Sequence, residues 1–410
     1  MSNVVQSDRG LGWVGLSVLS CLAGLLVQSS AATDWPQWRG PNGDGTTSEQ
    51  MANTNWTVQP PKLAWTTQVG LGFSGVAIRD GRAYTLGNVS NEDTVVCLDA
   101  RSGDTVWRHT YQAPGLAPGS YGKFRGPRAT PTVTAEHLYT LSQDGQLKCL
   151  SVTNGHPIWE TRIARDMSQR LREWYGFSSS PVFDRGTIYI NHGTYGLRVN
   201  AATGELLAPT DGKVNGYASP QFLRKTGDPL MILFGWDAVK AVNLTSGVIA
   251  WSGPWKTRFD VNAADPVVCP EGVFFTSGYE VGCALLDPET GKTKWSNKAI
   301  RAQCSPVVYK DEYINAGPGY LVCVEASSGK EMWRQKDLMG NLIIVDRYLV
   351  ILTTSGQLIL ARAAADAYLA LGSVRVLDGT CWIPPSYSSG RVYCRNDTGK
   401  LVCLVVDSTH

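Results

Sequence analysis

The sequence predicts an all-β protein: an eight-bladed β-propeller of four-stranded antiparallel blades, with the ring closed by an N-terminal strand. Three observations predict this fold. The 410 residues include 43 glycines, which indicate many tight turns and therefore many short strands. One strand–turn–strand pattern recurs along the chain, and an isolated strand near the N-terminus can complete the last repeat.

The recurring pattern is an apolar run, a polar turn ending in Gly, and a strand that usually closes with Trp. Six segments follow it: "VVCLDARSGDTVW" (95–107), "LKCLSVTNGHPIW" (147–159), "LRVNAATGELL" (197–207), "VKAVNLTSGVIAW" (239–251), "CALLDPETGKTKW" (283–295) and "LVCVEASSGKEMW" (321–333). Four short strands in each repeat are typical of a propeller blade. We expect the repeated Trp to fill the gap between neighbouring blades rather than to stack on a cofactor.

Eight inner strands are expected, each followed by the rest of its blade. They lie near 74–86, 129–141, 180–191, 219–234, 265–276, 305–315, 341–354 and 382–394. The last repeat supplies only three strands, and "PPKLAWTTQV" (60–69) would add the fourth, with Trp65 where other blades have Trp107 or Trp159. This pairing closes the ring and leaves no open edge between the first and last blades.

The segment "DWPQWRGPNGDG" (34–45) precedes the closing strand. Its Asn, Asp and Gly residues suggest a calcium loop. However, the segment lacks the D-x-[DN]-x-[DN]-G spacing of such a loop and the acidic residue at its twelfth position. We therefore expect a leader into the closing strand, with Trp35 and Trp38 packed against the rim of the propeller.

The first 32 residues have the pattern of an export signal. Arg9 precedes the apolar run from Leu11 to Val27, and small residues allow cleavage after Ala32. An uncleaved membrane anchor and a lipid-modified Cys21 remain as alternatives. We thus expect a signal peptide (1–32), a leader (33–59) and one propeller domain (60–410) in an exported monomer. Its location would be periplasmic or extracellular, with peripheral membrane association as an option.

The charge balance bears on the class of partner, and the positions of the cysteines bear on their structural role. Lys plus Arg is 37 against 35 Asp plus Glu, which gives no reason to expect nucleic acid as a partner. Cysteines recur at one position of the repeated strand, where Cys acts as a small buried apolar residue. One pair differs: a turn at Thr398-Gly399 would place Cys394 opposite Cys403 and allow a disulfide.

The segments before the inner strands should all open onto one face of the ring, at the mouth of the channel. They bring together the candidate ligand-binding residues Arg125, Arg128, Trp174, Tyr175, Tyr217, Asp260, Asn262, Asp265, Arg301, Gln303 and Trp382. Aromatic, Arg and Asn side chains suit a small polar or anionic ligand, a peptide or a sugar. The alternative is that they only satisfy strand ends and close the channel. Asp265 is distinct, because it replaces the Ser or Thr of other repeats.

No motif points to other chemistry. The five histidines have no metal-ligand spacing, and no nucleophile elbow, P-loop or dinucleotide fingerprint is present. We therefore assign no catalytic residue and no metal ligand.

Taken together, the "A-x-[ST]-G-x-x-x-W" turns, the entering segments "ATPTV", "SSPVF", "ASPQF" and "CSPVV", and the closing strand resemble the quinoprotein-like superfamily of eight-bladed propellers over roughly residues 60–410. The leader and the "DVNAADPVV" and "SGYEVGCALL" segments resemble exported bacterial proteins with PQQ-like repeats. Two branches share this fold: quinone-dependent alcohol and sugar dehydrogenases, and the propeller lipoprotein of the outer-membrane protein assembly machine.

The resemblance to the dehydrogenases implies pyrroloquinoline quinone (PQQ) with calcium, held beside two adjacent cysteines. This chain has no adjacent cysteines, so no cofactor is predicted. We expect a non-catalytic binding or scaffolding module for a protein or a small polar ligand at the channel mouth. The alternatives are a divergent PQQ-dependent oxidoreductase acting on an alcohol or sugar, and a membrane-tethered outer-membrane protein assembly factor.

Overall fold

Short strands separated by Gly-rich turns build every sheet of this computed structural model. It describes residues 34–114, 125–163, 175–208, 211, 216–224, 227–303, 307–311, 313–317 and 319–407. These residues contain β-strands and turns but no α-helix, so they contain no helix able to span a membrane. The predicted signal peptide lies outside them.

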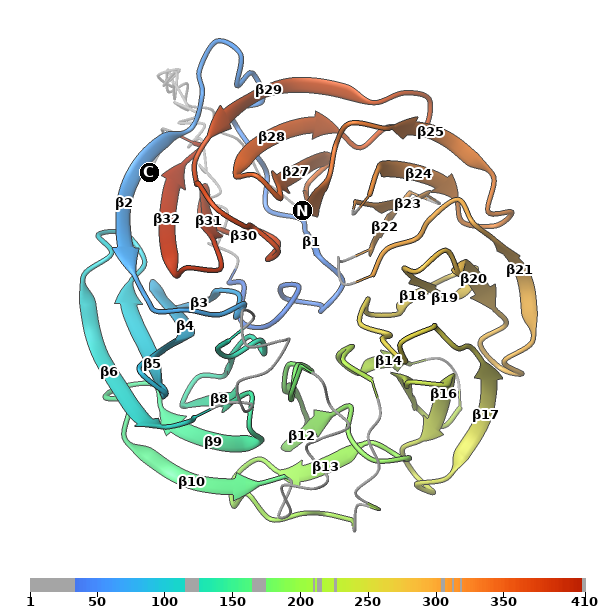
Figure 1. The fold of residues 1–410 in the computed structure, drawn as a ribbon, viewed down its shortest axis with the longest axis horizontal. Helices are drawn as coiled ribbons and strands as arrows, with labels where there is room; N and C mark the ends of the chain where they lie inside the picture. The colour runs from blue at the N-terminus through green and yellow to red at the C-terminus, as the bar shows by residue number, and fades with distance from the viewer. Residues whose placement is uncertain are drawn as a thin grey trace, which may run out of the picture. The chain divides into compact units, whose positions relative to one another are not determined.

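Eight sheets are arranged around a common centre, which confirms the predicted propeller (Figure 1). Blades 1 to 4 follow in chain order from an inner to an outer strand. Blade 1 has β3 (Ala77–Arg79), β4 (Arg82–Val89), β5 (Glu92–Asp99) and β6 (Thr105–Gln112); blade 2 has β7 (Thr132–Val133), β8 (His137–Leu141), β9 (Gln146–Ser151) and β10 (Pro157–Arg162); blade 3 has β11 (Val182–Asp184), β12 (Thr187–Ile190) and β13 (Leu197–Asn200); blade 4 has β14 (Gln221–Leu223), β15 (Leu230–Phe234), β16 (Ala238–Asn243) and β17 (Ile249–Pro254).

Blades 5 to 8 repeat this arrangement. Blade 5 has β18 (Val267–Cys269), β19 (Gly272–Ser277), β20 (Gly282–Leu286) and β21 (Thr293–Asn297); blade 6 has β22 (Val307–Lys310), β23 (Tyr313–Ala316), β24 (Leu321–Glu325) and β25 (Glu331–Gln335); blade 7 has β26 (Gly340–Val345), β27 (Tyr348–Thr353), β28 (Gln357–Arg362) and β29 (Leu369–Arg375); blade 8 has β30 (Ser386–Ser388), β31 (Arg391–Arg395), β32 (Lys400–Val405) and β2 (Lys62–Gln68).

Blade 3 departs from the four-stranded pattern. Its sheet has three strands, and an isolated bridge between Val199 and Leu206 stands where the other blades have an outer strand. This repeat, "LRVNAATGELL", also lacks the terminal Trp of the others.

Blade 8 is completed from the N-terminal side, as expected. Strand β2 pairs antiparallel with β32, and Trp65 lies opposite Cys403. Arg395 of β31 reinforces this seam from within, because its buried guanidinium donates to the carbonyl oxygens of Gly70, Ser74 and Leu86 and to the Thr85 hydroxyl, all in or beside blade 1. The first and last blades are therefore joined by both backbone pairing and a buried side chain.

Six of the eight blades are joined to the next blade by the repeated tryptophan, which confirms its predicted architectural role. Each indole N–H donates to a backbone carbonyl in the next blade: Trp65 to Ala100, Trp107 to Val152, Trp159 to Ala201, Trp251 to Pro288, Trp295 to Ala326 and Trp333 to Ala364, at 2.9–3.2 Å. The turn glycine lies directly against the ring. At Gly155, for example, φ is 72° and a Cβ atom would lie 2.4 Å from the Trp107 ring. Only glycine fits both the backbone conformation and the space.

A second link joins neighbouring blades at the point where the chain enters each inner strand. The backbone N–H of Gly75 donates to the Thr130 hydroxyl, that of Thr130 to Ser180, and that of Ser180 to Ser219, at 2.9–3.0 Å. The Ser219 N–H then donates to a carboxylate oxygen of Asp265, at 2.6 Å. The Ser/Thr-Pro segments thus form a belt of hydrogen bonds over blades 1 to 5, and Asp265 takes the place of a hydroxyl in it.

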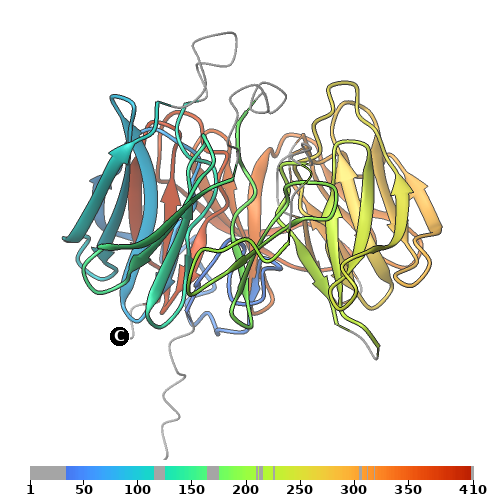
Figure 2. The same cartoon turned by 90° about the horizontal axis from the view of Figure 1, so that it is seen from below.

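The leader runs over one face of the ring, toward the ends of the inner strands (Figure 2). Trp35 exchanges two backbone hydrogen bonds with Ile78 of blade 1, and the Pro36 carbonyl accepts from Val133 of blade 2. Further along, β1 (Thr46–Thr47) pairs in parallel with β26 of blade 7. Trp35 and Trp38 do not pack against the rim as expected. Trp35 pairs with the inner strand β3, and Trp38 contacts Asp265, which precedes the inner strand β18. We name this side the leader face.

The disulfide that the sequence allowed between Cys394 and Cys403 is not formed. Both cysteines are buried free thiols. The N–H of Asn396 donates to the carbonyl of Lys400, so this pair encloses three residues, 397–399, rather than the expected two. This shifts the register by one: Cys394 lies opposite Val402, and Cys403 lies opposite Tyr393. Adjacent residues of a strand point to opposite faces of its sheet, so the two thiols do not face each other.

Candidate functional site

The face opposite the leader carries the segments that precede the inner strands, and we name it the mouth face. Five planar side chains lie in sequence along it, one from each of blades 8, 1, 2, 3 and 4. In this order they are Trp382, Phe73, Arg128, Tyr175 and Tyr217. We name this set the mouth arc.

Contacts between neighbours make the arc continuous. The rings of Trp382 and Phe73 stack with centroids 5.8 Å apart and an interplanar angle of 24°. The Arg128 guanidinium lies 5.4 Å from the Phe73 centroid and 5.7 Å from that of Tyr175, within the range of cation–π attraction. Tyr175 meets Tyr217 edge to face at 5.8 Å.

Backbone contacts position these side chains. The Phe73 N–H donates to the Pro127 carbonyl, which lies beside Arg128. The Tyr175 carbonyl accepts from the Gln143 amide, and the Tyr217 N–H donates to the Asn262 carbonyl. Trp382 keeps 40% of its surface exposed, and the other four members are partly buried. The arc is thus an accessible aromatic surface with one positive charge near its middle.

The sequence predicted four of the five members. Phe73 was missed. The other members were chosen because they lie in segments that precede inner strands, and Phe73 also lies in such a segment: "GLGFSG" precedes the inner strand of blade 1, just as "RGPRATP" precedes that of blade 2. Trp174 lies outside the described residues, and Arg125 is described and exposed beside the arc.

Asp265 does not line the mouth. Its second carboxylate oxygen accepts from the Trp38 indole N–H at 2.5 Å and lies 3.7 Å from the Arg39 guanidinium. The side chains of Arg39 and Asp265 are 1% and 3% exposed. Burial raises the pKa of Asp265, while the charge of Arg39 opposes that shift; burial likewise lowers the pKa of Arg39. The carboxylate that the sequence marked as exceptional therefore anchors the leader.

Asn262 and Asp260 also lie apart from the arc's surface. Asn262 is fully buried, where its amide donates to the Gly235 carbonyl and its oxygen accepts from the Ser277 hydroxyl. Asp260 is exposed in a turn at a φ of 55°. Asn262 thus supports the backbone that holds Tyr217.

Arg301 and Gln303 line a separate cavity on the mouth face, between blades 5 and 6. It measures about 340 Å³, and Tyr279, Tyr320 and Arg334 also contribute to its wall. Gln303 donates to the Tyr279 hydroxyl at 2.7 Å, and Arg301 pairs with Glu280. Six of the predicted mouth residues therefore fall into two groups: Arg128, Tyr175, Tyr217 and Trp382 belong to the arc, and Arg301 and Gln303 belong to the cavity at blades 5 and 6.

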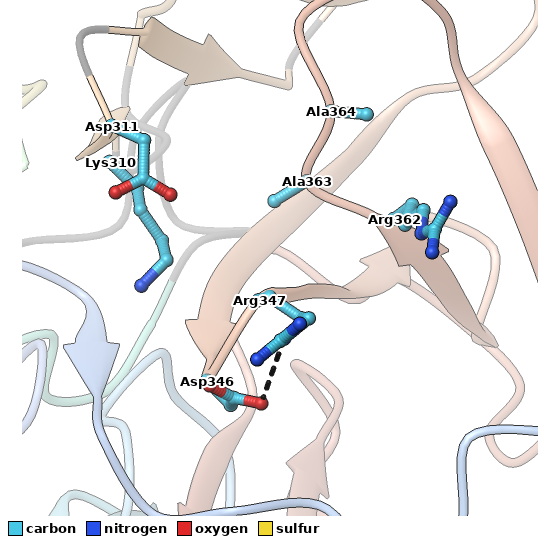
Figure 3. A pocket seen from close by; sticks show the side chains of 7 residues that line it. All are labelled: Lys310, Asp311, Asp346, Arg347, Arg362, Ala363 and Ala364. Carbon is cyan, nitrogen blue, oxygen red and sulfur yellow. Dashed lines mark hydrogen bonds and ion pairs between the residues drawn. The ribbon is translucent and has the colours of Figure 1, made fainter.

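Another pocket, of about 410 Å³, lies at hairpin ends of blades 6 and 7 (Figure 3). Lys310, Arg347 and Arg362 give it basic character, while Asp311 and Asp346 offset that charge. In Figure 3 the Arg347 guanidinium faces Asp346, and Arg362 lies away from this pair. The Arg347 Nε and Asp346 Oδ2 atoms are 3.3 Å apart. The basic groups do not converge on one point.

The described residues do not fit PQQ with calcium. They contain no group of three or more His, Cys, Asp or Glu side chains able to hold a metal ion. The one carboxylate placed toward the centre by its repeat position, Asp265, already faces the cationic Arg39. A guanidinium at that point repels a divalent cation, and the sequence has no adjacent cysteines.

Comparisons with known proteins agree with the propeller fold. Residues 46–226, less than half of the chain, match the family model described as outer membrane protein assembly factor BamB. The chain is an eight-bladed propeller of PQQ-like repeats. No curated protein matches its sequence.

Solved structures extend the likeness of fold over most of the propeller. BamB from Moraxella catarrhalis aligns with a TM-score of 0.63 and 12% identity, covering 84% of this chain and 99% of BamB. Quinohemoprotein alcohol dehydrogenase from Comamonas testosteroni aligns at 0.69 and 13%, covering 91% of this chain and 80% of the dehydrogenase. The computationally designed protein Ika8 aligns at 0.61 and 12%, covering 84% and 99%. A designed protein scores about as well as the natural ones, so the likeness concerns the fold alone.

Proposed function

We propose that this protein is an exported, non-catalytic binding module that engages a protein segment through the mouth arc. The continuous arc carries this proposal. Aromatic and Arg side chains are enriched at the energetic centres of protein interfaces, where large rigid surfaces bind with little loss of side-chain entropy. The match of residues 46–226 to the BamB model supports the same class of function.

The stacking within the arc favours binding over catalysis. Each planar group is held by its neighbours, so the surface is ordered before a partner arrives, which lowers the entropic cost of association. Arg128 is flanked by two rings, and its guanidinium donates to the Gly126 carbonyl at 3.2 Å, so its position in the arc is held on several sides. Export is proposed from the N-terminal sequence pattern.

Site-directed photo-crosslinking in the producing cell tests this function. A photo-reactive residue replaces Trp382 in the arc or, as a control, Leu369 on the outer strand of blade 7, which is 49% exposed. We expect a discrete adduct from position 382 that position 369 does not give, and we expect Arg128→Ala to reduce it. Identical adducts from both positions, or an adduct that Arg128→Ala leaves unchanged, would contradict a role for the arc.

A further inference from the structure

The cavity between blades 5 and 6 combines polar groups, aromatic side chains and an unusual turn. The turn connects β19 to β20, and its central residues, Tyr279 and Glu280, have φ angles of 56° and 64°. Asn and Gly are the usual residues in such a turn, because other side chains clash with the left-handed backbone. A Tyr-Glu pair in this conformation carries a backbone cost, and residues with such a cost are enriched at ligand sites.

Both side chains of the turn are directed to the cavity. The Tyr279 hydroxyl accepts from Gln303 at 2.7 Å, and the Tyr279 ring meets Phe259 edge to face at 5.0 Å. The Glu280 carboxylate reaches Arg301, which enters from the segment between blades 5 and 6. The turn therefore places a phenol and a carboxylate on a cationic wall.

A second cation, Arg334, also lines the cavity. Arg334 is only 18% exposed; it pairs with Glu331, donates to the Ala299 carbonyl at 2.9 Å and lies 5.2 Å from the Tyr320 centroid. Glu331 does not line the cavity. Each cation of the cavity thus has a carboxylate partner, Glu280 for Arg301 and Glu331 for Arg334, and only Glu280 belongs to the lining.

The Arg301–Glu280 pair is poised for exchange. Glu280 is 75% exposed, whereas Arg301 is 30% exposed. An exposed ion pair contributes little to stability, so the Glu280 carboxylate can leave for solvent at small cost. A ligand carboxylate could then take the same place with the bidentate geometry that guanidinium groups favour.

We propose that this cavity binds a small organic carboxylate, with its anionic group on Arg301 and its body against Tyr279, Tyr320 and Met339. The volume of about 340 Å³ suits a small molecule rather than a folded partner. Glu280 acts as an internal competitor that occupies Arg301 when no ligand is bound. The proposal is independent of protein binding at the mouth arc.

Isothermal titration of the purified protein with benzoate tests this site, with benzamide as the neutral analogue of the same shape. We expect saturable, salt-sensitive binding of benzoate and none of benzamide. Inorganic phosphate is the third probe. Phosphate binding at least as tight as that of benzoate would overturn the assignment to carboxylates.

Three variants locate the binding. Arg301→Gln should lower the affinity for benzoate by about tenfold or more, because it removes a charge-assisted pair. Glu280→Gln should tighten it by roughly two- to fivefold, because it removes the competitor. Arg128→Gln, the matched change in the mouth arc, should leave it unchanged. Failure of benzoate to saturate at tens of millimolar, unchanged binding by Arg301→Gln, or weaker binding by Glu280→Gln would overturn the proposal.

Discussion

Asp93 is a buried carboxylate at the junction of blades 1 and 2. It lies opposite Tyr111 across β5 and β6 and accepts from the Asn88 amide at 2.7 Å. Burial raises its pKa to about 7, and the nearby charge of Asp144 acts in the same direction. The unfolded chain loses this proton near its ordinary value, about 3.9. The folded protein is thus penalised as the pH rises from about 4 to 7, and the penalty is complete above 7.

We expect Asp93→Asn to stabilise the protein at pH 8 and to have no such effect at pH 4. The amide retains an acceptor for Asn88 and removes the buried charge, so the gain should be on the order of 2–4 kcal/mol at pH 8. Urea unfolding at both pH values measures it, with the exposed Asp337→Asn as the control. A gain of equal size at pH 4 would show that packing rather than ionisation is responsible.

At the scale of elements, the leader is held to the ring by one buried ion pair and by backbone pairing. Arg39 and Asp265 are nearly inaccessible to solvent, so removing one partner leaves the other charge buried without this contact. We expect Arg39→Met alone to cost about 3–5 kcal/mol of unfolding free energy. Asp265→Ser alone should also destabilise, although it restores the hydroxyl of the other repeats.

The double variant measures how much of the stability lost in each single variant comes from the Arg39–Asp265 contact itself. Arg39→Met with Asp265→Ser removes both charges and keeps an acceptor for the Ser219 N–H, so its loss should be well below the sum of the single losses. Thermal unfolding of all four proteins gives the coupling energy. Additive losses would mean that the leader is held by its backbone pairing with β3 and β26 rather than by this pair.

Local regularities made most elements predictable. Turn glycines and closing tryptophans recur at fixed places, because each blade docks on the next in the same way. The Cys394–Cys403 register was missed, because a loop of two residues cannot be told from one of three by its letters alone. Asp265 stood out against the Ser or Thr of its sibling repeats, but its partner Arg39 is distant in sequence and no pattern joins the two.

For the whole molecule, the same scaffold aligns with a quinohemoprotein alcohol dehydrogenase and with BamB, so fold alone does not decide whether a quinone binds. The decision rests on what occupies the centre of the ring. Here Trp38 and Arg39 of the leader contact Asp265, so this buried carboxylate already has an indole donor and a guanidinium as partners.

We therefore expect no stabilisation of the protein by PQQ with calcium. A ligand at a hundredfold excess over its dissociation constant would add about 2.7 kcal/mol to the unfolding free energy, a shift that thermal unfolding detects readily. Arg39→Met serves as the informative companion, because it frees the Asp265 carboxylate. A saturable shift in the unaltered protein would revive the oxidoreductase alternative. A shift only in Arg39→Met would show that the leader itself closes an otherwise competent quinone site.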